Sequence, residues 1–167
     1  VFDRFHIVKL MNDKLTTLRR ELHRDAEDGP EKLALKKTRW LLLKNPHHLD
    51  PDRNEQQRLE QALELNRPLA IAYYLKEDLR QLWEQTNKRE AGKFLTDWCA
   101  RARASGIKVL ETMANTLSEH RKGILAWYDH PISTGPLEGT NNKINTLKRQ
   151  AYGFRDPEYF HLKIYAI

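Results

Sequence analysis

The chain has 167 residues and a mass of 19.8 kDa, which is enough to bury a core as one domain or as a domain with a subdomain. Lysine and arginine number 29 against 23 acidic residues, so the net charge of +6 favours a polyanionic partner but falls far short of a histone-like excess. The single cysteine, Cys99, excludes an intramolecular disulfide and a multi-cysteine zinc cluster, and no run of about 18 apolar residues could span a membrane.

The first predicted element is a long helix over about 4–24. Phe5, Val8, Met11 and Leu15 recur at steps of three and four residues, and Asp28-Gly29-Pro30 ends the segment. Val1 and Phe2 could end a buried strand, but two residues are too few to establish a period. Further helices are predicted over about 31–44, 52–65, 68–86, 88–104 and 107–127, with proline, glycine and asparagine at the breaks. The middle of the chain is thus predicted to be all-helical.

A loop over 128–134 precedes a helix that begins near Pro136 and ends at Gly153, and a last helix begins at Asp156-Pro157. At 100° per residue, the helix near Pro136 carries an apolar stripe and a polar face nearly opposite to it. The stripe holds Leu137, Ile144, Leu147 and Ala151, and the polar face holds Glu138, Asn142, Asn145 and Arg149. Over 136–155 the basic residues are Lys143, Lys148, Arg149 and Arg155 against Glu138 alone, or 4 − 1 = +3.

Glu138 allows two interpretations. A glutamate in the first turn is what simple helix capping requires, and from this helix alone capping is the better explanation. The second interpretation is functional, because the carboxylate stands among amides and a guanidinium that suit phosphate oxygens. The other end of the chain decides between them.

Two long motifs resemble the ISL3 family of insertion-sequence transposases. The opening Val1-Phe2-Asp3-Arg4-Phe5-His6-Ile7-Val8-Lys9 resembles the segment with the family's second catalytic aspartate. The C-terminal pattern stands here as Gly135, Glu138-Gly139, Asn141-Asn142-Lys143-Ile144, Lys148-Arg149 and Tyr152-Gly153-Phe154-Arg155. Similar stretches lie between them, at Arg39-Trp40-Leu41-Leu42-Leu43-Lys44-Asn45 and Ala104-Ser105-Gly106-Ile107.

The resemblance implies the C-terminal part of a ribonuclease H-like α/β core interrupted by an all-helical insertion, so that the chain itself is mainly α. Its segments would be 1–25 and 128–167 of the core and 26–127 of the insertion. Such enzymes use three carboxylates to hold two Mg²⁺ ions about 4 Å apart, with Mn²⁺ as a possible substitute. Asp3 and Glu138 match the second and third acids. The first belongs to an earlier strand that this chain does not contain, so we expect the chain alone to be inactive.

The same resemblance implies DNA cleavage at transposon ends and strand transfer into target DNA. Double-stranded DNA is the expected partner, with Asn142, Asn145, Lys148, Arg149 and Arg155 as contacts near the scissile phosphate. A homodimer or higher synaptic complex, a cytoplasmic location at the bacterial nucleoid and no membrane association are also expected. The rival hypothesis is a non-catalytic helical module, derived from a transposase, that binds DNA or a protein.

Other polar and aromatic residues have simpler interpretations. Asp97 and Asp129 are expected to be exposed, His6 to be structural, and His47, His48 and His120 to lie on the surface without metal. Trp40, Trp83, Trp98 and Trp127 are placed for interhelical packing. One of these tryptophans could instead stack on an extruded base. Nothing in the sequence selects which one, so this alternative stays open.

Overall fold

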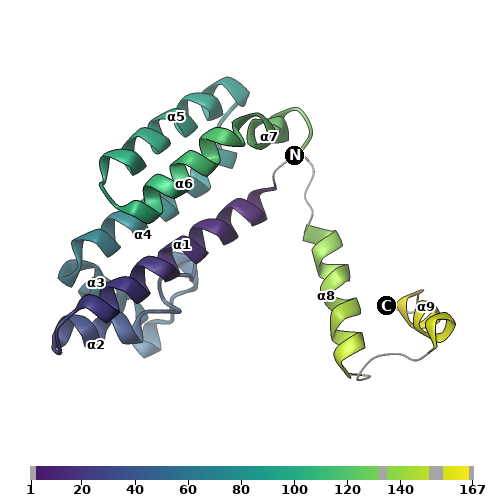
Figure 1. Ribbon diagram of the computed structural model, residues 1–167, viewed down its shortest axis with the longest axis horizontal. Helices are drawn as coiled ribbons and strands as arrows, with labels where there is room; N and C mark the ends of the chain where they lie inside the picture. Colours follow the sequence, from purple (N-terminus) through teal and green to yellow (C-terminus); the bar gives the residue numbers. More distant parts are fainter. Residues whose placement is uncertain (1–2, 132–134, 151–155, 166–167) are drawn as a thin grey trace. The chain divides into compact units, whose positions relative to one another are not determined.

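The computed structural model describes residues 3–131, 135–150 and 156–165, and the regular structure in these ranges is entirely helical (Figure 1). The prediction of a mainly α chain is confirmed for them, and the strands of a ribonuclease H-like core are not among them. The chain divides into two compact units, residues 1–131 and 132–167. We call the described part of the first unit, residues 3–131, the helical body.

Helix α1, Arg4–Asp25, confirms the predicted helix over 4–24. Its buried residues Ile7, Met11, Leu15 and Leu18 follow the helical period that the sequence shows. This stripe packs against α4, Arg67–Leu79, and α6, Lys108–Glu119. Because α1 contributes four residues to the common core, its position within the helical body is fixed by packing against the other helices.

Helix α2, Pro30–Lys37, is shorter than the predicted helix over 31–44. The hydroxyl of Thr38 donates to the carbonyl of Ala34 at 3.0 Å, and the chain then leaves the helix in turns. Leu41 and Leu42 are 3% and 1% exposed within these turns. The apolar run that suggested a longer helix is buried as an irregular segment, because tertiary packing overrides the local period.

Two short 3₁₀ turns, η1 at Pro46–His48 and η2 at Pro51–Arg53, lead into α3, Glu55–Leu65. The predicted start at residue 52 is wrong because Asn54 adopts a left-handed conformation with φ 50°. The Glu55 carboxylate accepts from Lys44 Nζ at 2.5 Å and from the Asp50 amide at 2.9 Å. These bonds hold the turn segment onto α3.

The remaining helices of the body follow the predicted order with two changed boundaries. Helix α4 is capped by Asn66 and continues as η3, Arg80–Trp83, and α5 spans Lys88–Ala104. The predicted helix over 107–127 is divided at His120 into α6, α7 at Arg121–Leu125 and η4 at Ala126–Tyr128. No helix among the described residues is long and apolar enough to cross a membrane.

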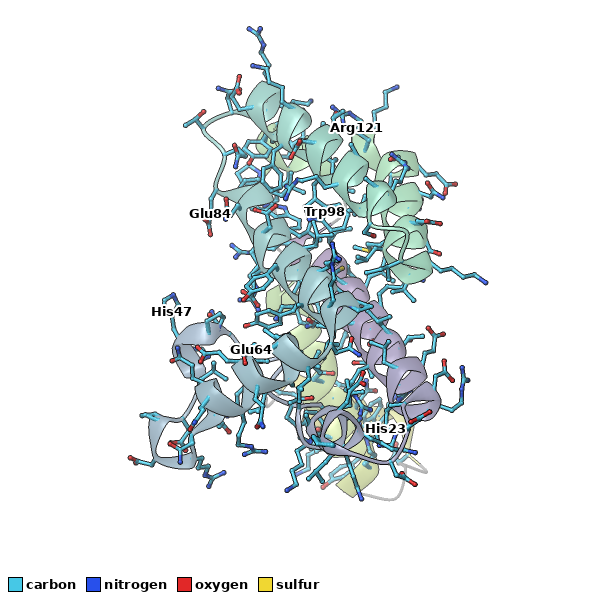
Figure 2. The ribbon with its side chains drawn as sticks, turned by 90° about the vertical axis from the view of Figure 1, so that its left-hand side faces the viewer. His23, His47, Glu64, Glu84, Trp98 and Arg121 are labelled. Carbon is cyan, nitrogen blue, oxygen red and sulfur yellow. The ribbon has the colours of Figure 1, made fainter. Side chains whose placement is uncertain are left out.

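Trp98 lies at the centre of the helical body (Figure 2). It is 0% exposed, and its indole nitrogen donates to the Leu75 carbonyl at 2.9 Å. Cys99 is buried beside it and contacts the Ala114 carbonyl, as expected for a packing residue. Trp83 is also buried and Trp127 partly buried, whereas the prediction of a core position is wrong for Trp40, which is 65% exposed.

The second unit contains α8, Gly135–Gln150, and α9, Pro157–Tyr165. The Asp156 carboxylate caps α9 by accepting from the amides of Glu158 and Tyr159 at 2.9 and 3.2 Å. Lys148 Nζ lies 5.0 Å from the centre of the Phe160 ring, which joins the two helices. The predicted helix over 136–153 is confirmed as far as Gln150, and Gly153 lies outside the described residues.

Candidate functional site

Asp3 is the N-cap of α1. Its backbone is extended, with φ −70° and ψ 147°, and its side chain accepts a hydrogen bond from the Phe5 amide at 3.4 Å. The residue is only 4% exposed. An aspartate in this place satisfies a free amide of the first turn, and its charge is favoured by the helix dipole. The helix therefore fixes the position of a buried carboxylate.

The residues after Asp3 connect this end of α1 to η3. The guanidinium of Arg4 lies 5.8 Å from the centre of the Trp83 ring. Phe5 is half-exposed, and its ring meets the exposed His6 ring edge to face, with centroids 5.9 Å apart. The buried carboxylate is thus followed in sequence by an arginine that lies over Trp83 and by an exposed aromatic pair.

Glu138 lies in the first turn of α8, which begins at Gly135. Its side chain is outside the described residues. Because Asp3 and Glu138 belong to different units, each is described within its own helix. Asp3 starts a helix of 22 residues and Glu138 lies near the start of a helix of 16 residues.

The polar face predicted on α8 is exposed in the described part of the helix. Asn142, Asn145, Lys148 and Arg149 are all exposed, whereas Ile144 and Leu147 of the apolar stripe are half-buried. Lys148 also packs on Phe160, so its ammonium group is held by α9 as well as by its own helix. Arg155, the fifth predicted DNA contact, lies outside the described residues.

The expected exposure of Asp97, Asp129, His47 and His48 agrees with the structure. Asp97 is exposed and pairs with Arg101 at 2.7 Å, and Asp129 is exposed and pairs with Lys88. His47 and His48 are exposed, and His120 is half-buried. Among the described residues, no three His, Cys, Asp or Glu side chains are grouped closely enough to hold a metal ion.

One role of Asp3 was missed by the interpretation of the sequence. The aspartate stands immediately before the first residue of a strongly periodic helix, which is the pattern of an N-cap. The hydrogen bond to the Phe5 amide shows that this cap is formed. Asp3 therefore has a structural role as a helix cap. A test of a catalytic role must distinguish the loss of the cap from the loss of a metal ligand.

Comparisons with known proteins agree on one family. The model of the ISL3 family of DDE transposases, described as a transposase, matches residues 1–164. The transposase for insertion sequence element IS1001 of Bordetella parapertussis is 39% identical over 168 residues, which cover 99% of this chain and 41% of that protein. The transposase for element IS1557 of Mycobacterium tuberculosis H37Rv is 38% identical over 125 residues, covering 74% of this chain and 27% of that protein.

The chain thus spans less than half the length of these two relatives. No solved structure matches it. The family match includes both the segment that begins at Asp3 and the helix that carries Glu138. The chain belongs to the ISL3 family of DDE transposases.

Proposed function

We propose that the full-length protein containing this chain cuts DNA at the ends of an insertion sequence and joins the freed ends to target DNA. The observation that carries this proposal is the family match over residues 1–164, which includes both acid-bearing segments. The relatives named transposases support it. Water is the proposed nucleophile for cleavage, and the 3′ hydroxyl that cleavage frees attacks a phosphodiester of the target.

The residues proposed to hold divalent metal are Asp3 and Glu138. Carboxylate oxygens suit Mg²⁺ or Mn²⁺, and Asp3 supplies such a group in a fixed place at the start of α1. Because the family resemblance places the first acid on a strand that precedes Asp3, we infer that a further acid comes from another part of the full-length protein. Two bound ions would activate the attacking oxygen and stabilise the leaving oxygen.

The proposed architecture assigns 1–25 and 128–167 to a ribonuclease H-like core and 26–127 to a helical insertion. The packing of α1 on α4 and α6 supports the part of this proposal in which the insertion holds Asp3 in place. Asn142, Asn145, Lys148, Arg149 and Arg155 are the proposed contacts to double-stranded DNA. Because transposition joins two element ends, we propose a homodimer or higher synaptic complex.

The experiment that tests the proposed function is cleavage of a labelled duplex containing the element end by the full-length protein. Strand cuts at the element boundary are expected with Mg²⁺ or Mn²⁺ and are expected to stop when the metal is chelated. Joined products should appear when target DNA is added. Metal-independent cutting, or no cutting of DNA that the protein binds, would refute the proposal.

Asp3→Asn separates the cap from the metal ligand. Asparagine caps a helix about as well as aspartate, so the free energy of unfolding should change by less than about 0.5 kcal/mol. Cleavage by the full-length protein should nevertheless fall by about a hundredfold or more, because a neutral amide is a poor metal ligand. Urea denaturation and cleavage rates measure the two effects.

Asp3→Ala is the matched control, because it removes both roles. It should lose the same activity and, in addition, about 1 kcal/mol of stability. If Asp3→Asn cleaves at the original rate, Asp3 is only a cap.

Lys148→Ala combined with Arg149→Ala is expected to weaken binding of the full-length protein to duplex DNA. If each cation neutralises one phosphate, the slope of log affinity against log salt should become shallower by about two. Fluorescence anisotropy at several salt concentrations measures this slope. Lys163→Ala is the control on α9, because Lys163 is exposed and lies 5.5 Å from the Tyr159 ring. An unchanged slope in the double variant would remove these residues from the DNA interface.

A further inference from the structure

Trp40 is a large aromatic side chain held on the surface of the helical body. It is 65% exposed, whereas Trp83 and Trp98 are buried. The guanidinium of the adjacent Arg39 lies 4.5 Å from the centre of its ring. With Arg39 on the ring and most of the indole area still accessible, Trp40 offers a flat surface for a second stacking partner.

The turn that carries Trp40 is anchored on both sides. Leu41 and Leu42 are buried, and the Trp40 carbonyl accepts from the amides of Leu43 and Lys44 at 3.2 Å. The Leu42 carbonyl accepts from Lys76 Nζ at 2.7 Å. Lys76 is itself 2% exposed, and burial lowers its pKa, although its ion pair with Glu77 opposes that shift. The exposure of Trp40 therefore follows from a fixed turn.

Basic residues are frequent in α2 and in the turn that follows it. Residues 30–44 contain five basic residues and one acid, or 5 − 1 = +4, which exceeds the +3 of residues 136–155. Lys36, Lys37 and Arg39 are exposed. Arg58 of α3 reaches the Lys37 carbonyl at 3.2 Å. We define the Trp40 patch as the exposed residues Arg20, Lys36, Lys37, Arg39, Trp40 and Arg58.

The cations of the Trp40 patch have no acidic partners in the described part of the chain. Lys32 pairs with Asp28 and Lys44 pairs with Glu55, but no described carboxylate pairs with any of the five patch cations. Arg19 lies among them and donates to the Leu35 carbonyl at 3.0 Å. Burial lowers the pKa of Arg19, and the charges of Arg20 and Arg39 lower it further. The patch therefore concentrates uncompensated positive charge.

Nearby grooves are lined by groups that can meet a polyanion. One, of about 230 Å³, is lined in part by Lys37, Thr38, Arg58 and Gln61. Another is lined in part by His23, Lys32 and Lys36 and also by Asp28, which pairs with Lys32. Both lie beside α2, so hydrogen-bond donors and cations extend along the helix next to the aromatic surface.

The patch is remote from Asp3 along α1. Arg19 marks the position of the patch on α1, because its pKa is lowered by burial and also by the charges of the patch residues Arg20 and Arg39. Arg19 is 19 − 3 = 16 residues after Asp3. At 1.5 Å per residue this separation is about 24 Å along the helix axis. A duplex rises about 3.4 Å per base pair, so straight DNA running parallel to α1 would cover this separation in roughly seven base pairs.

We propose that the Trp40 patch is a second DNA-binding surface, in which the cations contact phosphates and the Trp40 ring stacks on an unpaired base. The inference rests on the proposed function, because it assigns DNA as the polyanion. Bases inside an intact duplex present only their edges, so an exposed indole can stack on a base only where pairing has been lost or at a duplex end. A protein partner would instead require apolar area or acids to complement the patch.

The first test measures binding of the full-length protein to a fluorescent duplex of about 30 base pairs and arbitrary sequence, about 100 Å long. The variant replaces Lys36, Lys37 and Arg39 with alanine. If all three contact phosphates, the slope of log affinity against log salt should become shallower by about three. An unchanged slope overturns the proposal.

The matched control replaces Arg89, Lys93 and Lys122 with alanine. Like the test variant, it removes two exposed lysines and one exposed arginine, and so the same total charge. Arg89 and Lys93 line a groove with Arg121, which lies at the opposite end of the helical body from His23 (Figure 2). The control should retain the original slope. Equal losses in the two triple variants would show an effect of net charge and overturn the assignment.

The second test addresses stacking. With a short single-stranded overhang on the duplex, Trp40→Ala should lower the affinity of the full-length protein by about tenfold or more, and Trp40→Phe should retain most of it. A blunt duplex should show a smaller effect. Equal affinity of the original protein and Trp40→Ala for the overhang would exclude stacking.

These binding measurements are independent of cleavage. If the Asp3 and Glu138 variants lose cleavage while the Trp40 patch variants still show the expected changes in DNA binding, that result would support the patch independently of the proposed function. Normal cleavage combined with unaffected binding in all patch variants would refute the patch and leave the proposed function standing.

Discussion

Glu138→Gln in the full-length protein is expected to lower metal-dependent cleavage of element-end DNA by about a thousandfold or more. The substitution keeps the size of the side chain but removes the charge of a proposed metal ligand, and a loss of about 4 kcal/mol in transition-state stabilisation corresponds to this factor. Glutamine is also a good helix former, so α8 should persist. Single-turnover cleavage rates with Mg²⁺ measure the effect.

Glu158→Gln is the control for charge in the same unit, because Glu158 is an exposed residue in the first turn of α9. This variant should cleave normally. DNA affinity in chelator should be retained by Glu138→Gln, which separates lost chemistry from lost binding. Cleavage by Glu138→Gln at the original rate would assign Glu138 to helix capping.

Trp98→Ala is expected to reduce the free energy of unfolding of the helical body by about 3–5 kcal/mol. The side chain is 0% exposed, and its removal leaves a cavity and takes away the indole hydrogen bond to the Leu75 carbonyl. Because the net stability of a domain is typically about 5–15 kcal/mol, this change would consume much of it. Urea denaturation followed by circular dichroism measures the loss.

Trp40→Ala is the matched control, since it makes the same substitution at a residue that is 65% exposed. Its free energy of unfolding should change by less than about 0.5 kcal/mol. Similar losses at the two tryptophans would contradict the burial of Trp98 in the core.

The order and positions of most helices could be predicted from local patterns, and the exceptions have physical causes. The period of α1 predicted its bounds within a residue, and asparagine was expected at the breaks, one of which is the Asn66 cap of α4. The run Leu41-Leu42-Leu43 suggested helix but is folded as a turn, because Thr38 binds back to Ala34 and Leu41 and Leu42 are buried in the core. Such packing depends on residues distant in sequence, which a local period does not contain.

The candidate site shows a similar division. The motifs around Asp3 and Glu138 indicated the family, and the family match agrees. The exposed face of α8 followed from its spacing of polar residues. The exposure of Trp40 could not be predicted, because a tryptophan between apolar and basic residues fits either a core or a surface position. The turn that carries Trp40 is held by the buried Lys76, which donates to the Leu42 carbonyl and is 34 residues from Leu42 in the sequence.

The capping position of Asp3 would couple the proposed metal site to local unfolding of α1. The first turn of a helix can open without the rest of the body, and such opening would release the carboxylate from its bond to the Phe5 amide. A metal ion that binds only when this turn is closed would favour the closed turn by mass action. Hydrogen exchange of the backbone amides in the first turn of α1 should then become slower when metal is added. If Asp3 is a metal ligand as proposed, heating should raise the metal concentration that cleavage by the full-length protein requires before the helical body melts, because the proposed ligand is lost when the first turn of α1 frays.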